Sequence, residues 1–125
     1  MNGNDYLVDT NIVLYLLSGD QTLAKILTGG KIYVSEITEI ELLSYPDISA
    51  QEEVRIKAFL ADVIVIQLNE QIKAHTISLR RKYRLKLPDA MIAATAQHMN
   101  LPLISADRRL EQIEEVSFFL YEFEG

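Results

Sequence analysis

Tyr6-Leu7-Val8-Asp9-Thr10-Asn11-Ile12 opens with a short apolar run that ends in an aspartate. A hydroxyl and an amide follow, and the apolar pattern then changes from the period of a strand to that of a helix. This change predicts a buried strand that carries Asp9 at its carboxyl end, with a helix starting immediately after it. In an open α/β sheet, ligands bind outside the carboxyl ends of the strands. We therefore expect Asp9 to lie at the binding edge of such a sheet.

Strand and helix patterns alternate along the rest of the chain. We expect strands at 6–8, 32–34, 63–66, 101–104 and 118–121, and helices at 12–17, 20–27, 36–44, 49–60, from 69 into the basic segment 80–86, from 87 to about 96, and briefly after Asp107. This alternation predicts a single domain over residues 1–125, a three-layer α/β/α fold whose mainly parallel central sheet has about five strands.

Three segments carry more specific expectations. The run Val63-Ile64-Val65-Ile66 has four β-branched residues without a polar interruption, which predicts a strand covered on both faces. The last strand, 118–121, is expected at the sheet edge, and the acidic tail 122–125 is expected to be loose.

The composition narrows the class of protein. The chain has 125 residues, 49% of them hydrophobic and 24% charged, as in an ordinary globular domain. It contains no cysteine, which excludes a disulfide framework, a thiolate zinc site and a cysteine nucleophile, and which suits a reducing cytoplasm. We find no signal-peptide pattern and no apolar run near the ~20 residues that span a membrane. The net charge of −6 argues against binding a nucleic-acid duplex through a basic field.

Three aspartates stand where a strand or loop passes into a helix: Asp9, Asp89 and Asp107. Each alone suits a helix cap. Asp9 and Asp107, however, follow strands of one parallel sheet, and Asp89 starts a helix rich in alanine that can approach the sheet closely. If these carboxylates converge, keeping all of them ionised without a cation is unfavourable in free energy, because like charges raise one another's pKa. A hard divalent cation bound by oxygen atoms removes that cost.

Glu41 lies inside a helix, so capping does not explain it. At ~100° per residue it falls near the face of Ile37 and Ile40, with Glu39 nearly opposite. We therefore interpret Glu36 and Glu39 as solvated acids and Glu41 as the fourth candidate ligand, although a boundary glutamate with its carboxylate in water fits the same pattern.

Polar residues beside the aspartates have three interpretations. Thr10 or Asn11 would orient Asp9, bind the water of a metal ion, or only satisfy the helix start, and Ser105 has the same alternatives beside Asp107.

Four motifs together resemble the PIN-domain ribonucleases. They are Val8-Asp9-Thr10-Asn11-Ile12, Ser35-Glu36-Ile37-Thr38-Glu39-Ile40-Glu41-Leu42, Leu87-Pro88-Asp89-Ala90-Met91-Ile92-Ala93-Ala94 and Leu103-Ile104-Ser105-Ala106-Asp107. The first motif alone is weak, but all four occur in the order of the family and span nearly the whole chain. The compact length is similar to that of the VapC toxins of toxin–antitoxin pairs.

The resemblance implies a function and a site. It implies an endoribonuclease that depends on Mg²⁺ or Mn²⁺, usually a homodimer, which a small cognate antitoxin protein holds inactive. It also implies Asp9, Glu41, Asp89 and Asp107 as the acidic site, and RNA as the substrate.

A basic segment is the candidate contact for the RNA backbone or for an acidic part of the antitoxin. Its residues are Arg80, Arg81, Lys82, Arg84 and Lys86. The alternative is a solvated helix end, where cations suit the negative pole of the helix.

Three other classes of protein compete with a nuclease. A haloacid-dehalogenase-type phosphotransferase needs a second acid two residues after the first, where this chain has Asn11. A receiver-like signalling domain needs an aspartate after the third strand, where this chain has Gln67-Leu68-Asn69. A catalytically silent PIN-like interaction module remains open.

Overall fold

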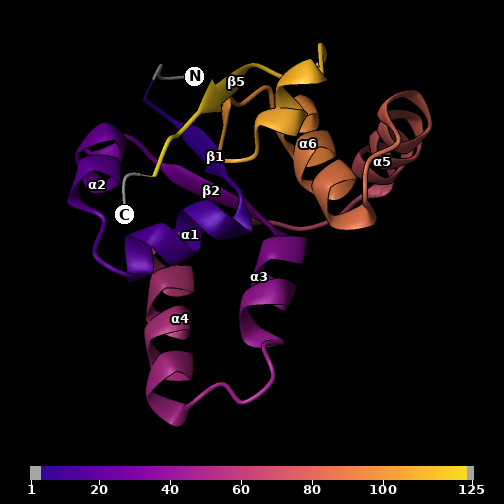
Figure 1. The fold of residues 1–125 in the computed structure, drawn as a ribbon. Coiled ribbons are helices and arrows are strands. Elements are labelled where there is room, and N and C mark those ends of the chain that lie inside the picture. The colour runs from indigo at the N-terminus through magenta and orange to yellow at the C-terminus, as the bar shows by residue number, and fades with distance from the viewer. Residues whose placement is uncertain (1–3, 124–125) are drawn as a thin grey trace.

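The computed structural model describes residues 4–123, which form a five-stranded sheet with helices on both faces (Figure 1). The strands are β1 (Tyr6–Val8), β2 (Ile32–Ser35), β3 (Ile64–Ile66), β4 (Leu103–Ser105) and β5 (Phe118–Leu120). The helices are α1 (Thr10–Leu17), α2 (Gln21–Leu27), α3 (Glu36–Leu43), α4 (Ala50–Asp62), α5 (Glu70–Tyr83), α6 (Leu87–Met99) and the 3₁₀ helix η1 (Arg108–Gln112). The predicted three-layer α/β/α fold is confirmed.

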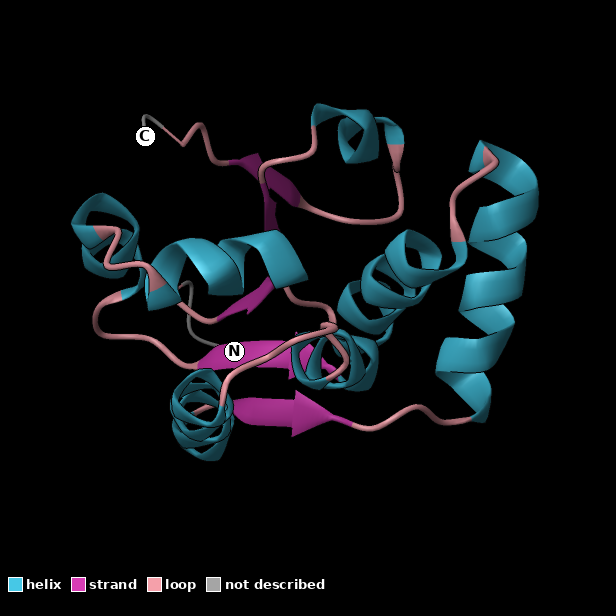
Figure 2. Ribbon diagram, turned by 60° about the horizontal axis from the view of Figure 1, so that its bottom comes forward, coloured by secondary structure: helices cyan, strands magenta, loops and turns pink. Residues whose placement is uncertain are grey.

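The sheet is parallel throughout, with the strand order β3-β2-β1-β4-β5. Figure 2 shows its strands turning progressively from one edge to the other, the twist that parallel sheets normally have. The chain starts at the central strand β1, builds outward through β2 and β3, and then crosses to β4 on the other side of β1. This reversal is a topological switch point, where open α/β sheets bind ligands. The order also differs from the 2-1-3-4-5 order of receiver domains.

Successive residues of each central strand point to opposite faces and enter two separate cores. Leu7 and Leu103 pack with α5 and α6, whereas Val8 and Ile104 pack with α1, α2, α3 and α4. Figure 1 shows α5 and α6 lying together, apart from α1, α2 and α4. The alternation fixes the register, because a slip of one residue would turn every core side chain to the other face.

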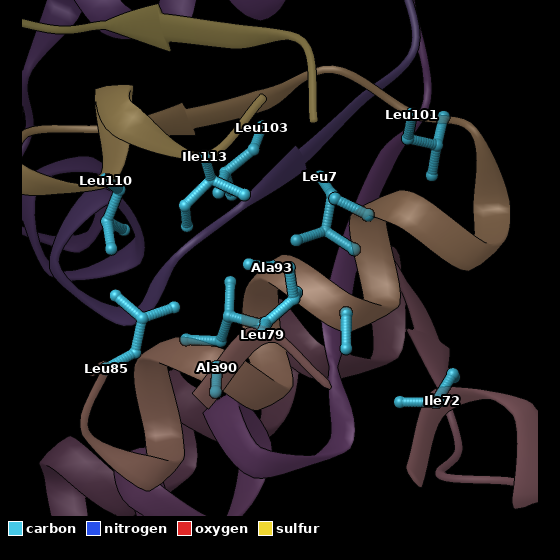
Figure 3. Packing of buried hydrophobic residues seen from close by; sticks show 13 residues of the cluster. Leu7, Ile72, Leu79, Leu85, Ala90, Ala93, Leu101, Leu103, Leu110 and Ile113 are labelled. Carbon is cyan, nitrogen blue, oxygen red and sulfur yellow. The ribbon is translucent and has the colours of Figure 1, made fainter. Parts of the chain in front are cut away.

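Small residues bring α6 close to the sheet. Ala90, Ala93 and Ala94 have no exposed surface. Figure 3 shows Ala93 between Leu79 of α5 and the strand residues Leu7 and Leu103. The close packing of α6 holds its first turn, and therefore Asp89, at the carboxyl edge of the sheet.

The predicted helix starts are confirmed where a side chain caps the helix. Asp20 and Asn69 accept hydrogen bonds from the amides of Leu23 and Ile72. Ser49 and Glu52 form the predicted reciprocal capping box.

The prediction for residues 63–66 was wrong in two respects. Val63 is the C-cap of α4 and precedes the strand, and the edge strand β3 is not covered on both faces, because Ile64 is 40% exposed. A run of β-branched residues signals a strand, but it does not show whether helices cover both faces of that strand. The predicted strand 101–104 is also displaced, because Leu101 and Pro102 precede β4.

The expectation of a loose tail was wrong for the described residues 122 and 123. The ring of Phe123 stacks on Tyr15 at 4.2 Å between centroids, and Glu122 pairs with Arg108 at 3.2 Å. Residues 124 and 125 lie outside the described part of the chain. As predicted, the strand before this tail, β5, lies at the sheet edge.

Candidate functional site

Asp9 lies at the carboxyl end of the central strand β1, next to β4. Its amide donates to the carbonyl of Ile104 at 3.3 Å, which continues the pairing of the two strands. Its side chain is only 7% exposed and caps α1 by accepting from the amide of Ile12 at 3.0 Å. Asp9 is therefore both a helix cap and a buried carboxylate at the switch point.

Ser105 joins Asp9 to Asp107. Its hydroxyl acts on the Asp9 carboxylate and lowers the pKa of that group, and its Oγ accepts from the amide of Asp107 at 3.0 Å. Because Ser105 ends β4 and is fully buried, its bond fixes the amide of Asp107 at the sheet edge. The hydrogen bond to the amide of Asp107 is the structural role considered for Ser105, at the start of η1.

Glu41 reaches the same region from α3. The Thr10 hydroxyl donates to Glu41 Oε1 at 2.6 Å, and Thr10 Oγ1 also lies 3.1 Å from Thr38 Oγ1. Thr10 therefore orients Glu41 rather than Asp9. Thr38, which is fully buried, joins the candidate site through this contact and was not predicted from the sequence, although its position one helical turn before Glu41 was a usable signal. Asn11 is exposed.

The reasoning that selected Glu41 from the helix face was wrong in part. Ile40, one of its two reference residues, is 50% exposed, and the buried face of α3 carries Thr38 and Leu42. Glu36 is not a merely solvated acid, because its Oε1 accepts from the amide of Leu68 at 2.9 Å.

Burial and mutual repulsion disfavour the ionised forms of Asp9 and Asp89. Burial is the main cause that raises the pKa of Asp9, and repulsion from Asp89 and Asp107 raises it further. The hydrogen bonds from Ser105 and Ile12 lower it in part. Burial likewise raises the pKa of Asp89, followed by repulsion from Asp107 and, more weakly, from Glu41. The electrostatic coupling thus links all four predicted acids.

Asp107 behaves differently because it has its own cation. The Arg109 guanidinium contacts both oxygens of its carboxylate, with Nε 3.0 Å from Oδ1 and Nη2 2.7 Å from Oδ2. This contact is the main cause that lowers the pKa of Asp107. Arg109 was not among the site residues predicted from the sequence.

The predicted basic segment divides into two parts. Arg84 and Lys86 line a small pocket of about 150 Å³ together with Asp89, Asp107 and Arg109. Other members of the segment have structural partners instead: Arg80 donates to the carbonyl of Leu85 at 3.2 Å, and Lys82 pairs with Glu115 at 3.1 Å. The segment therefore does not present one continuous basic surface to the acids.

The donor set suits a hard divalent cation in kind, because it consists of carboxylates and hydroxyls around a buried aspartate whose charge is disfavoured. As they stand, residues 4–123 contain no group of three or more Asp, Glu or His side chains that could hold a metal ion. Thr10 holds Glu41, and Arg109 holds Asp107. Arg109 contacts both carboxylate oxygens of Asp107, so a cation bound there would require this guanidinium to move.

A match to the model of the PIN domain family covers residues 6–116. The chain belongs to the PIN domain family. The residues matched by the family model include all four predicted acids. A search of the curated proteins gave no match. The five-stranded parallel sheet is thus the sheet of a PIN domain.

Solved structures agree with this assignment. A toxin–antitoxin complex from Klebsiella pneumoniae is 31% identical, with 94% of this chain and 99% of that chain covered and a TM-score of 0.76. VapBC2 from Rickettsia felis, bound to a DNA fragment of its promoter, shares the fold at 20% identity, with 94% and 99% covered and a TM-score of 0.80. VapBC-1 from nontypeable Haemophilus influenzae shares the fold at 23% sequence identity, with 93% of this chain and 97% of that chain covered and a TM-score of 0.77. The expected similarity to VapC-type PIN toxins is confirmed.

No helix among the described residues of this PIN domain is both long and apolar enough to cross a membrane.

Proposed function

We propose that this PIN domain is an endoribonuclease that depends on Mg²⁺ or Mn²⁺, hydrolyses RNA phosphodiester bonds, and acts as the toxin of a type II toxin–antitoxin pair in the cytoplasm. The observation that carries the proposal is the electrostatic coupling of four carboxylates at the switch point of a PIN sheet. They come from four different parts of the chain: Asp9 after β1, Glu41 in α3, Asp89 in α6 and Asp107 after β4.

The four acids are the proposed holders of the cation. When bound, a divalent cation supplies a water of lowered pKa and stabilises negative charge on the phosphate. Ser105 and the amide of Ile12 keep the buried Asp9 carboxylate oriented, and Thr10 does so for Glu41. Such supporting hydrogen bonds fix ligand geometry, so Thr10 and Ser105 belong to the working site.

Cations beside the acids support RNA as a substrate. Lys86 and Arg84 line the pocket that also contains Asp89 and Asp107, which supports a role for both in contacting a phosphate next to the one that is cleaved. We assign Arg81, Arg80 and Lys82 a weaker, more distant role, because the last two already have partners in the fold.

A protein partner is supported by the similarity to toxin–antitoxin complexes and by the exposed apolar surface. Leu68, Ile77 and Leu87, each at least 38% exposed, line a groove of about 500 Å³ along α5 and the start of α6. Contiguous exposed apolar surface is typical of protein interfaces. We propose a small antitoxin and a second copy of this chain as partners. Light scattering of the chain alone, and then with the product of the neighbouring reading frame, measures each association.

The experiment that tests the activity is cleavage of single-stranded RNA by the purified protein with Mg²⁺ or Mn²⁺. Wild type should cleave RNA, whereas EDTA and Asp9→Asn should each abolish cleavage. Asp5→Asn is the matched control, because Asp5 is a buried aspartate that accepts from the amide of Lys31 at the other end of β1. Cleavage that survives EDTA or Asp9→Asn would refute the mechanism.

A second candidate is an interaction module without catalysis. The observation in its favour is that the described acids do not form a ready metal site. The same assay separates the two candidates, because an interaction module would cleave no RNA under any metal condition and would still bind its partner.

A further inference from the structure

Arg108 and Arg109 are adjacent, equally exposed arginines with different partners. Their side chains are 69% and 70% exposed. Arg108 pairs with Glu122 in the carboxyl-terminal segment, whereas Arg109 folds back onto Asp107 in the acidic site. The guanidinium of Arg109 is therefore the one that lies among the proposed metal ligands.

Arg109 occupies most of the bonding capacity of Asp107. Oδ1 accepts from both the amide and Nε of Arg109, each at 3.0 Å, and Oδ2 accepts from Nη2 at 2.7 Å. A carboxylate offers about four lone-pair positions, so roughly one is left for another ligand. A bidentate arginine pair of this kind is both directional and charge-assisted.

The same guanidinium acts on the neighbouring acid. Arg109, together with Lys86, offsets part of the repulsion that Asp107 and Glu41 exert on Asp89. Asp89, Asp107, Arg109 and Lys86 line one pocket of about 150 Å³. Arg109 thus supplies to Asp107 and Asp89 the positive charge that a metal ion would otherwise bring.

We propose that Arg109 is a positioning residue that serves as the resident counter-ion of the acidic site, and that it competes with the divalent cation for Asp107. The inference rests on the proposed function only in taking Asp107 as a ligand of the cation. A cation held by Asp107 would take the place of the guanidinium on this carboxylate, and without the cation Arg109 pairs with Asp107 as in the structure.

The test is isothermal titration of Mn²⁺ into the metal-free protein without RNA. Arg109→Gln removes the charge and the bidentate pair, and we expect it to bind Mn²⁺ about three- to tenfold more tightly than wild type. Arg109→Lys keeps the charge but loses the bidentate geometry, so its affinity should lie between the two. Arg108→Gln removes the same charge one residue away and should bind as wild type does.

The contrary results are equally specific. Affinity for Mn²⁺ that is unchanged or weaker in Arg109→Gln, equal tightening in Arg108→Gln, or no binding by any variant would overturn the inference. Because Arg109 is exposed and the Asp107 cap is retained, thermal unfolding in EDTA should show that every variant folds.

This titration and the RNA-cleavage assay fail separately. If wild type cleaves RNA with a metal ion but the affinity for Mn²⁺ does not change in Arg109→Gln, only the counter-ion role of Arg109 is refuted. Tighter Mn²⁺ binding by Arg109→Gln without cleavage by wild type refutes the nuclease alone.

Discussion

The Thr10 hydroxyl donates a 2.6 Å hydrogen bond to the carboxylate of Glu41, 31 residues further along the chain. Thr10 is the first residue of α1 and directly follows Asp9. The bond therefore connects the acid at the end of β1 to the acid of α3, and it makes the direction of Glu41 depend on the start of α1.

Thr10→Val tests this connection. Valine keeps the shape of threonine but leaves the Glu41 carboxylate without its donor. We expect RNA cleavage to fall on the order of tenfold to 100-fold, and the free energy of unfolding to fall by about 1 kcal/mol. The measurements are the cleavage rate and urea unfolding. Thr76→Val is the control, because it removes a buried hydroxyl from α5 that bonds only within its helix, to the carbonyl of Ile72. Cleavage equal to that of wild type in Thr10→Val would contradict the orienting role.

Asp9 makes the stability of the metal-free protein depend on pH. Its pKa is raised in the folded state by burial and by repulsion from Asp89 and Asp107. Its contribution to folding is therefore complete below the pKa of the unfolded chain, and it is lost as the pH rises through the raised folded pKa. The ionised Asp9 of the metal-free protein is accordingly destabilising at neutral pH.

Asp9→Asn should remove this pH dependence. Asparagine keeps an oxygen that caps Ile12 but carries no charge, so the melting temperature of Asp9→Asn in EDTA should exceed that of wild type at pH 7 by a few degrees. The difference should shrink on acidification, when Asp9 of wild type is protonated. Thermal unfolding between pH 3.5 and 8 measures it, and a difference that is constant with pH would disprove the assignment.

The close packing of α6 predicts a stability effect away from the acids. Ala93 is fully buried between the sheet and α5, so Ala93→Leu should lower the free energy of unfolding by roughly 1–3 kcal/mol through overpacking. Ala74→Leu on the exposed side of α5 should change it by less than about 0.5 kcal/mol. Denaturant unfolding compares the two, and equal effects would show that α6 is less tightly packed than described.

Local sequence patterns predicted the elements and their order, because each pattern reflects forces within a short segment. Asp9 and Asp107 could be assigned to one edge because parallel strands share a direction. The same patterns did not show that β3 is an edge strand, since that depends on which strand pairs with which. Val63-Ile64-Val65-Ile66 is equally apolar in either position.

The connections between site residues were less predictable than the residues themselves. Glu41 was selected partly through Ile40, which is exposed, whereas its actual partner Thr10 lies in another helix. Arg108 and Arg109 are the same residue type, and only the turn of η1 after Asp107 directs one toward Glu122 and the other toward the acids. Such contacts depend on tertiary geometry, which the periodicity of apolar residues within one segment does not predict.

Comparing RNA cleavage by variants of Glu41 and Glu39 tests the central claim most directly. The claim is that four coupled acids form the active site of a metal-dependent nuclease. Both are glutamates of α3, but Glu41 alone accepts from Thr10 and acts on Asp89 among the interactions described. The rate of RNA cleavage with Mn²⁺ should fall by about 100-fold or more in Glu41→Gln and remain that of wild type in Glu39→Gln. Cleavage at the wild-type rate by Glu41→Gln, or equal losses in both variants, would contradict the account.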